Sequence, residues 1–479
     1  MSVKRKVRVW RGGAAIPVAY APPSPIATRH RLHRALPGTA TPGSRGRERK
    51  PPGMRDAVVV WMTLVLRWVG LACAGALAVA PWPAGAAPAT FIEGVAAGDV
   101  VQDRAVLWTR APAPGPVTLL LDTRPDLRRA RTVPAEARPD DGLAVHVDVG
   151  GLAAATRYHY RFVQGGAESA TGSFVTPPPS DSAVPVALAW SADTAEEFRP
   201  FRIFDALARQ QPDLFLYLGD TVYADLGERA VTLAQYRAKY RANRADPHLQ
   251  AALARTAVWA TWDDHEVANN FDASHPRLPV GRRAFLEAWP VRPPRQEPGR
   301  LYRRVRWGAL VEVFLLDTRQ YRSPARHPDG PGKTMLGAAQ KRWLLEGLAA
   351  STAPVKVVAS SVPLRYHGRD SWEGYAHERD EILAFLRARA VRGVVVLSGD
   401  VHYPALLRHP EGVVEGIAGP LAAFPNPDPP AAGRPATVWW GFARFNVGLV
   451  RVAPGGLTLE WYDDRGDLLY RFHTALAGR

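Results

Sequence analysis

Cysteine is almost absent from this chain of 479 residues, in which Cys73 is the single example. One cysteine excludes a framework of disulfides and any zinc site built from paired cysteines. The 47% of hydrophobic residues is typical of a globular protein, and a chain of this length buries a large core without such cross-links. The length corresponds to about two or three domains.

Acidic residues are fewer than basic ones, 45 against 61, and the net charge of +16 is unevenly distributed. Residues 1–53 hold twelve Lys/Arg and one Glu, which is +11, so the remaining 426 residues carry only +5. This first segment is rich in Pro, Gly and Arg and lacks apolar periodicity, which predicts a disordered basic tail or an over-long start of the chain. We expect no specific nucleic-acid partner for the folded body, because the basic excess lies in the tail.

One long apolar run begins at Met54 and is followed by small residues around Ala84–Ala87. This order is typical of a secretory signal, so we expect residues 54–87 to be a signal peptide and Met54 to be the true start. A membrane anchor is the alternative, because Ala57–Ala80 is long enough to cross a bilayer, but Arg67 would place a charge in mid-span. We therefore expect a secreted, periplasmic or cell-envelope protein whose mature form has no stable membrane span.

Residues 88–177 contain short alternating runs that are typical of β-strands, with Gly-Gly turns between them. The runs are Ala105–Arg110, Pro116–Asp122, Ala144–Val149 and Arg157–Val163. Tyr158 follows Gly151-Leu152 as in the tyrosine corner of immunoglobulin-like folds. The pattern predicts a small immunoglobulin- or fibronectin-III-like β-sandwich that acts as a scaffold, and the prolines at 177–179 mark its boundary.

Residues 183–479 alternate apolar strands with helices, which predicts an α/β (α+β) domain. The expected strands are Val184–Trp190, Asp213–Leu218, Ala257–Thr261, Val311–Leu316, Val355–Ser361 and Val394–Leu397, with others near Val413–Ala418, Phe445–Val452 and Leu457–Tyr462. Helices are expected at Pro200–Arg209 and near Ala338–Leu348.

Four of these strands end in short loops that carry aspartate, and two of the loops also carry histidine. The residues are Asp193, Asp220, Asp264 with His265, and Asp400 with His402. Ligands of open α/β sheets bind just outside the carboxyl ends of the strands, so we expect these side chains to converge. Asp317 is interpreted as an N-cap, the usual role of a lone aspartate after a strand. Because clustered carboxylates repel one another unless cations neutralise them, the pattern predicts a multi-metal site for Fe, Mn, Zn or Ca.

Tyr223 lies three residues after Asp220. If the loop turns helically, both side chains face the same way. A phenolate ligand would favour a hard trivalent ion such as ferric iron. Packing of the ring beneath the loop is the alternative, and the residues alone leave both open.

Five different short motifs follow one another along the chain. They are Gly219-Asp220-x-x-Tyr223, Trp262-Asp263-Asp264-His265-Glu266-Val267-x-Asn269-Asn270, Leu316-Asp317-Thr318-Arg319-Gln320-Tyr321-Arg322, Asp370-Ser371-Trp372-Glu373-Gly374-Tyr375 and Ser398-Gly399-Asp400-Val401-His402. Together they resemble the alkaline phosphatase D (PhoD-like) family of metallophosphoesterases. The segment from Phe91 to Asp99 and the segment from Asp103 to Arg110 look like the amino-terminal domain of that family.

The resemblance covers nearly all of residues 91–479 and implies an αββα sandwich that hydrolyses a phosphate-ester substrate as a phosphatase or phosphodiesterase. It also implies Fe(3+) and a second divalent metal, for which we expect Ca(2+). By the motifs, Asp220 would bridge two metals, Tyr223 would be the ferric phenolate, and Asp264 with Asn269 or Asn270 would complete the second site; we assign Asn269. Asp400 and His402 would be further ligands.

Two residues are expected to act on the phosphate itself. His265 would protonate the leaving oxygen or contact the phosphate. Arg319 is predicted to clamp the phosphate, because a guanidinium fork suits bidentate contacts with oxyanions.

The loop after the first strand of the second domain departs from the family. It reads Ser191-Ala192-Asp193-Thr194, where the family often has an iron-binding cysteine. We expect Asp193 to substitute as a metal ligand, which would harden the site. Two alternatives remain: a non-catalytic exported binding protein on a degenerate phosphatase fold, and a nucleic-acid-binding protein, which salt-dependent DNA binding by residues 88–479 would indicate.

Overall fold

The computed structural model describes residues 90–442 and 444–476 of the chain. The expected basic tail (1–53) and signal peptide (54–87) lie outside the described residues, as does Cys73. In the described ranges, no helix combines the length and the apolar character needed to cross a membrane.

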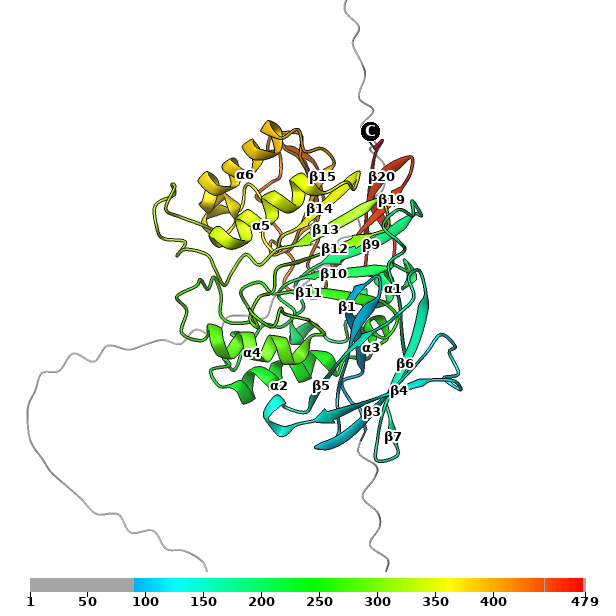
Figure 1. The fold of residues 1–479 in the computed structure, drawn as a ribbon. Coiled ribbons are helices and arrows are strands. Elements are labelled where there is room, and N and C mark those ends of the chain that lie inside the picture. Colours follow the sequence, from blue (N-terminus) through cyan, green and yellow to red (C-terminus); the bar gives the residue numbers. More distant parts are fainter. Residues whose placement is uncertain (1–89, 443, 477–479) are drawn as a thin grey trace, which may run out of the picture. The chain divides into compact units, whose positions relative to one another are not determined.

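Two large β-sheets form the centre of the fold (Figure 1). The first sheet consists, in spatial order, of β21 (Leu468–Thr474), β20 (Gly456–Asp463), β19 (Asn446–Ala453), β9 (Val186–Ser191), β10 (Leu214–Leu218), β11 (Ala257–Thr261), β1 (Val95–Val101), β2 (Arg104–Arg110) and β5 (Ala144–Gly150). The second consists of β12 (Arg303–Trp307), β13 (Val311–Leu315), β14 (Val355–Ala359), β15 (Val394–Ser398), β17 (Val414–Ile417), β16 (Ala405–Arg408) and β18 (Thr437–Trp440).

Side-chain alternation along the central strands explains how the sheets pack. On β10, Leu216 enters the core that both sheets share, whereas its neighbour Phe215 enters a second core on the outer face. On β13, Val313 and Phe314 divide in the same way between the shared core and a third one. Because successive residues of a strand point to opposite faces, strands covered on both sides are apolar throughout.

Helices cover the outer faces of both sheets (Figure 1). The first sheet is covered by α1 (Ile203–Arg209), α2 (Leu233–Arg244), α3 (Pro247–Leu253) and α4 (Leu278–Ala288), and the second by α5 (Gly337–Ala350) and α6 (Ala376–Ala388). Helix α2 begins with a capping box between Thr232 and Gln235, and α3 begins at Asp246, whose side chain accepts two backbone N–H groups. The expected αββα sandwich is confirmed.

An antiparallel β domain precedes this sandwich, also as expected. Its second sheet holds β4 (Arg131–Ala137), β3 (Gly115–Asp122), β6 (Arg157–Gln164) and β7 (Ala167–Glu168), with β8 (Gly172–Val175) beside β6. Leu119 and Phe162 of this sheet share one apolar core with Leu107 of β2. The Tyr158 hydroxyl accepts a hydrogen bond from the Ala153 N–H at 2.9 Å, which is the contact of a tyrosine corner.

Strand β1 joins the amino-terminal domain to the αββα sandwich. It runs parallel to β11, with Gly98 opposite Val258, so one sheet continues from the first domain into the second. A Cβ at Gly98 would lie 2.5 Å from the Pro290 carbonyl oxygen, so only glycine allows this approach. Asp99 secures the junction by accepting hydrogen bonds from the Arg292 N–H and from Nε of Arg303, both at 2.6 Å.

Candidate metal centre

The predicted ligands follow the carboxyl ends of strands from both sheets. Asp193, Asp220, Asp264 and Asp400 come after β9, β10, β11 and β15, respectively. Since β9, β10 and β11 are parallel, their ends meet at one edge of the first sheet. The backbone φ angles of Asp193 (71°), Asp220 (48°) and Asp400 (68°) lie in the left-handed region. Such conformations cost energy in residues other than glycine and are concentrated at functional sites.

The loops bring the predicted acids and histidines into three overlapping groups. In each group, one candidate ligand atom per residue lies within 4.8 Å of the others. The groups are Asp193, Asp220 and His402; Asp220, Asp264 and His265; and Asp263, Asp264 and Asp400. Asp220 and Asp264 each belong to two groups, and a shared carboxylate is the arrangement that a bridge between two ions requires.

Several carboxylate oxygens in these groups have no protein partner. Both oxygens of Asp193 and Oδ1 of Asp264 are buried without a hydrogen bond from the described residues. Burial raises the pKa of Asp193 and of Asp220 well above the usual range, and neighbouring carboxylates raise both further. Buried carboxylates without partners are costly, and cations would supply the missing partners. The residues present therefore fit a metal-binding site.

Tyr223 is buried and points toward the first group. Its hydroxyl lies 2.9 Å from Nε2 of His402, whose Nδ1 donates to the Phe424 carbonyl at 2.5 Å. Burial raises the pKa of Tyr223 and lowers that of His402, so the imidazole is neutral, with its Nε2 lone pair available. With Asp193 and Asp220, the group offers oxygen and imidazole ligands, a set that suits hard or borderline metals.

His265 is fixed by an aspartate that the sequence analysis did not select. Its Nδ1 donates to Oδ1 of Asp225 at 2.6 Å, which leaves Nε2 on the side of Asp264, 3.9 Å from Oδ1. Burial alone would lower the pKa of His265, but the charge of Asp264 and the hydrogen bond and charge of Asp225 raise it to about 9. The ring also lies against that of Tyr223, with centroids 4.3 Å apart.

Arg319 is buried among carboxylates, and its predicted role as a phosphate clamp stays a prediction. Its side chain is 0% exposed, and its fork donates to both oxygens of Asp263 at 2.6 Å. A third nitrogen lies 2.8 Å from Asp370, and Asp400 is 3.8 Å away. Nε and Nη2 of Arg319 therefore neutralise Asp263 and position its loop, whereas Nη1 is buried without a hydrogen bond from the described residues.

The two asparagines of the second motif differ in their contacts. The Asn269 N–H donates to Asp225 at 2.6 Å, at the edge of the site. The Asn270 N–H donates to Oδ2 of Asp264 at 2.6 Å, and its side-chain amide lies beside the carboxylate of Asp370. Both asparagines thus lie beside carboxylates of this region, and the assignment of Asn269 to the second metal site stays a prediction.

Two other acids shape the loops and are not directed at the centre. Glu266 accepts hydrogen bonds from the backbone N–H groups of Asp220, Thr221 and Asp263, which ties the loops after β10 and β11 together, and burial raises its pKa to about 7. Asp317 accepts hydrogen bonds from the N–H groups of Arg319 and Gln320 and so closes a turn; the expected N-cap is wrong, because no helix begins there.

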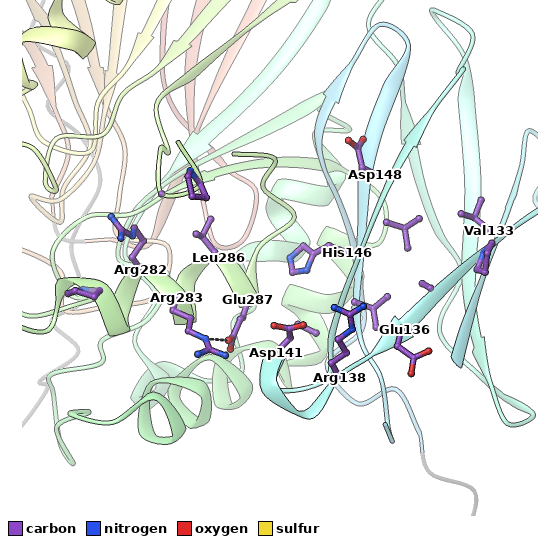
Figure 2. A pocket seen from close by; sticks show the side chains of 18 residues that line it. Val133, Glu136, Arg138, Asp141, His146, Asp148, Arg282, Arg283, Leu286 and Glu287 are labelled. Carbon is purple, nitrogen blue, oxygen red and sulfur yellow. Dashed lines mark hydrogen bonds and ion pairs between the residues drawn. The ribbon is translucent and has the colours of Figure 1, made fainter. Parts of the chain in front are cut away.

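The hollow beside the cluster measures about 600 Å³ and is lined in part by Asp400 and His402. A larger one of about 880 Å³ lies between β4, β5 and α4 (Figure 2). Charged side chains of both signs line it, and Arg283 pairs there with Glu287 at 2.9 Å. None of the candidate ligands lines the larger hollow, whereas Asp400 and His402 line the smaller one.

Comparisons with known proteins agree with this geometry. Residues 188–429 match the PhoD-like phosphatase family, and residues 76–178 match the PhoD-like phosphatase N-terminal domain. The chain therefore belongs to the PhoD-like phosphatase family. It is 31% identical to alkaline phosphatase D of Bacillus subtilis (strain 168) over 376 residues, which cover 65% of this chain and 64% of that relative.

Solved structures show the same fold. A structure of PhoD is 25% identical, with a TM-score of 0.73 over 80% of this chain and 89% of that one. The purple acid phosphatase PPD1 from yellow lupin (Lupinus luteus) seeds has a TM-score of 0.59 at 13% identity, over 80% of this chain and 73% of that one. The second likeness concerns the fold alone.

Proposed function

We propose that this protein is an exported, metal-dependent phosphatase or phosphodiesterase that hydrolyses phosphate esters with a metal-activated water. The observation that carries this proposal is the set of buried carboxylate oxygens of Asp193 and Asp264 without partners, beside a hollow open to a substrate. Membership of the PhoD-like phosphatase family supports phosphate-ester chemistry. The apolar run from Met54 and the small residues around Ala84–Ala87 support export.

We assign Fe(3+) and Ca(2+) to the centre. Asp193, Asp220, Tyr223 and His402 would hold the iron, and Asp220 would be shared with the second ion. Asp264 and Asp400 would hold the second ion, and Asn269 or Asn270 would complete its ligands. When bound, the metals supply positive charge to the phosphate oxygens and lower the pKa of a bound water.

The protein residues orient the ester and move the proton. His265 keeps Nδ1 on Asp225, so its Nε2 faces the centre and holds a proton for the leaving oxygen. Arg319 holds Asp263 and Asp370 and thereby keeps the loops after β11 and β14 in register. The bound phosphate is an anion in a site of carboxylates, so it binds only when the cations are present.

The test is hydrolysis of bis(4-nitrophenyl) phosphate by the full chain loaded with iron and calcium, with a chelated sample as the control. Release of 4-nitrophenolate that requires metal is the expected result. Asp220→Asn is expected to lose metal and activity while its circular dichroism spectrum stays that of the wild type. Absence of release with both metals bound would contradict the proposal and favour a binding protein on a phosphatase fold.

A further inference from the structure

The hollow beside the candidate metal centre is lined by rings. Besides Asp400 and His402, its walls include Tyr366, His367 and Phe424. Asp400 is the one acidic residue among its lining residues, and they include no lysine or arginine. The lining residues themselves thus supply no lysine or arginine for a second phosphate or a carboxylate group, and they offer ring faces to a planar, uncharged group.

Tyr366 is held on this wall at a conformational cost. Its φ angle of 72° is unusual for a bulky side chain. The ring is supported by the Arg434 guanidinium, 5.9 Å from its centroid, and its hydroxyl accepts from the Ala436 N–H at 3.4 Å. The neighbouring His367 is fixed by the Tyr403 hydroxyl at 2.7 Å. Strain of this kind persists only where the surroundings impose it, which is a reason to seek a role for the ring.

Phe424 is exposed, yet its position is set by contacts with residues of the candidate metal centre. Its side chain is 47% accessible, and its ring lies edge-on to those of Phe198 at 5.0 Å and Tyr223 at 6.3 Å. Its carbonyl oxygen accepts the Nδ1–H of His402. An exposed aromatic ring is thus tied by two contacts to residues that we assign to the iron, so its distance from the phosphate site is fixed.

We propose that this hollow is a subsite for an ester group that carries a planar aromatic ring, which packs against Tyr366 and Phe424 while the phosphate lies at the metals. The inference rests on the proposed function, and it names the class of substrate: a phosphate ester with an aromatic substituent. Burial of the substrate ring would cover the exposed face of Phe424.

The test compares two inert phosphonates that share one head group. Phenylphosphonate and methylphosphonate are titrated by calorimetry into the full chain loaded with iron and calcium. We expect the phenyl compound to bind about two- to tenfold more tightly, the range for an aromatic pair. Phe424→Ala and Tyr366→Ala are expected to bring this ratio near one and to leave methylphosphonate affinity unchanged. Tyr366→Phe keeps the ring and should keep the ratio.

Phe442→Ala is the matched control, because Phe442 is 70% exposed and does not line the hollow. Metal content is measured in every variant. If Phe424→Ala loses metal because its contact with Tyr223 is gone, the affinity ratio of Tyr366→Ala tests the aromatic subsite. Equal affinity of the wild type for both phosphonates, or an unchanged ratio in the alanine variants, would overturn the subsite and leave the proposed function intact. Failure of both phosphonates to bind the metal-loaded protein would overturn the proposed function and the subsite with it.

Discussion

Asp225 and His265 form a partly buried pair in which the carboxylate accepts the Nδ1–H at 2.6 Å. Asp225 also accepts the N–H of Asn269, so it fixes both the ring and the loop that follows it. The pKa of Asp225 is lowered: burial would raise it, but the hydrogen bond from His265 outweighs that effect. Asp225 is therefore a positioning residue for His265, and under the proposed function it would act on the reaction through that ring.

Asp225→Asn tests this relationship. The amide keeps the shape of the carboxylate but not its charge, so the Nε2 proton of His265 is held less firmly. We therefore expect kcat to fall about 10- to 100-fold, the usual cost of removing such a partner. The measurement is kcat and KM for bis(4-nitrophenyl) phosphate at several pH values, and the alkaline limb of the profile should move to lower pH. Asp205→Asn is the control, since Asp205 pairs with His248 at 2.9 Å on another part of the surface. A fall in kcat of the same size in both variants would contradict a specific role.

Tyr223→Phe tests the assignment of iron. The substitution removes the Tyr223 hydroxyl, the proposed oxygen ligand next to His402, and leaves Asp220 and Asp264 in place. We expect iron content to fall severalfold while calcium content changes little, because calcium is assigned to the other carboxylates. The measurement is elemental analysis of the purified variant, with Tyr158→Phe in the amino-terminal domain as the control. If the variant kept its full iron content and full activity, the Tyr223 ring would only pack beneath the loop and would not be an iron ligand.

Gly98→Ala tests the junction between the two domains. The added Cβ would lie 2.5 Å from the Pro290 carbonyl oxygen and 2.8 Å from that of Val258, and neither backbone atom moves freely. We expect a loss of about 1–3 kcal/mol in the free energy of unfolding, the usual cost of overpacking. Denaturant unfolding measures it, and Gly332→Ala is the control because an added methyl group there would meet no atom within 4 Å. Equal stability of both variants would show that β1 and β11 separate without cost.

The sequence predicted the central strands well because they are apolar on both faces and short. Residues Ala257–Thr261 form β11 with the expected bounds, and the aspartates after β9, β10 and β15 converge as expected. Strand β12 (Arg303–Trp307) was missed, since three of its five residues are arginines and it lies at the edge of the second sheet. Continuity of β1 with β11 was also missed, because pairing between distant strands leaves no local pattern.

The partners of the site residues were harder to predict than the ligands. Asp225 and Asp370 lie in loops without strand patterning, and their roles depend on which side chains fold against them. The chemistry of Arg319 predicts a phosphate clamp, whereas its burial and its pairing with Asp263 are not visible in the sequence. A buried guanidinium among carboxylates serves first to balance their charge.

Glu415 on β17 is a buried anion outside the metal centre whose ionisation affects stability. It accepts hydrogen bonds from the Leu364 N–H and the Ser398 hydroxyl and lies 2.8 Å from Nε2 of His409. Burial would raise the pKa of Glu415, but the hydrogen bond and the charge of His409, with the other donors, hold it below the usual value. The ionised form is thus favoured more in the folded protein than in the unfolded chain.

Glu415→Gln is therefore expected to destabilise the protein in a pH-dependent way. A group with a lowered folded pKa contributes stability above its unfolded pKa of about 4.3, and that contribution is lost as the pH falls through the folded value. We expect the variant to lose about 3–5 kcal/mol at pH 7, the cost of breaking a buried ion pair, and to approach the wild type as the pH falls below about 4. Denaturant unfolding at pH 7 and at acidic pH measures the gap, with Glu136→Gln on the exposed surface of β4 as the control. A gap between wild type and variant that stays constant with pH would show that Glu415 contributes through its shape and hydrogen bonds and not through its charge.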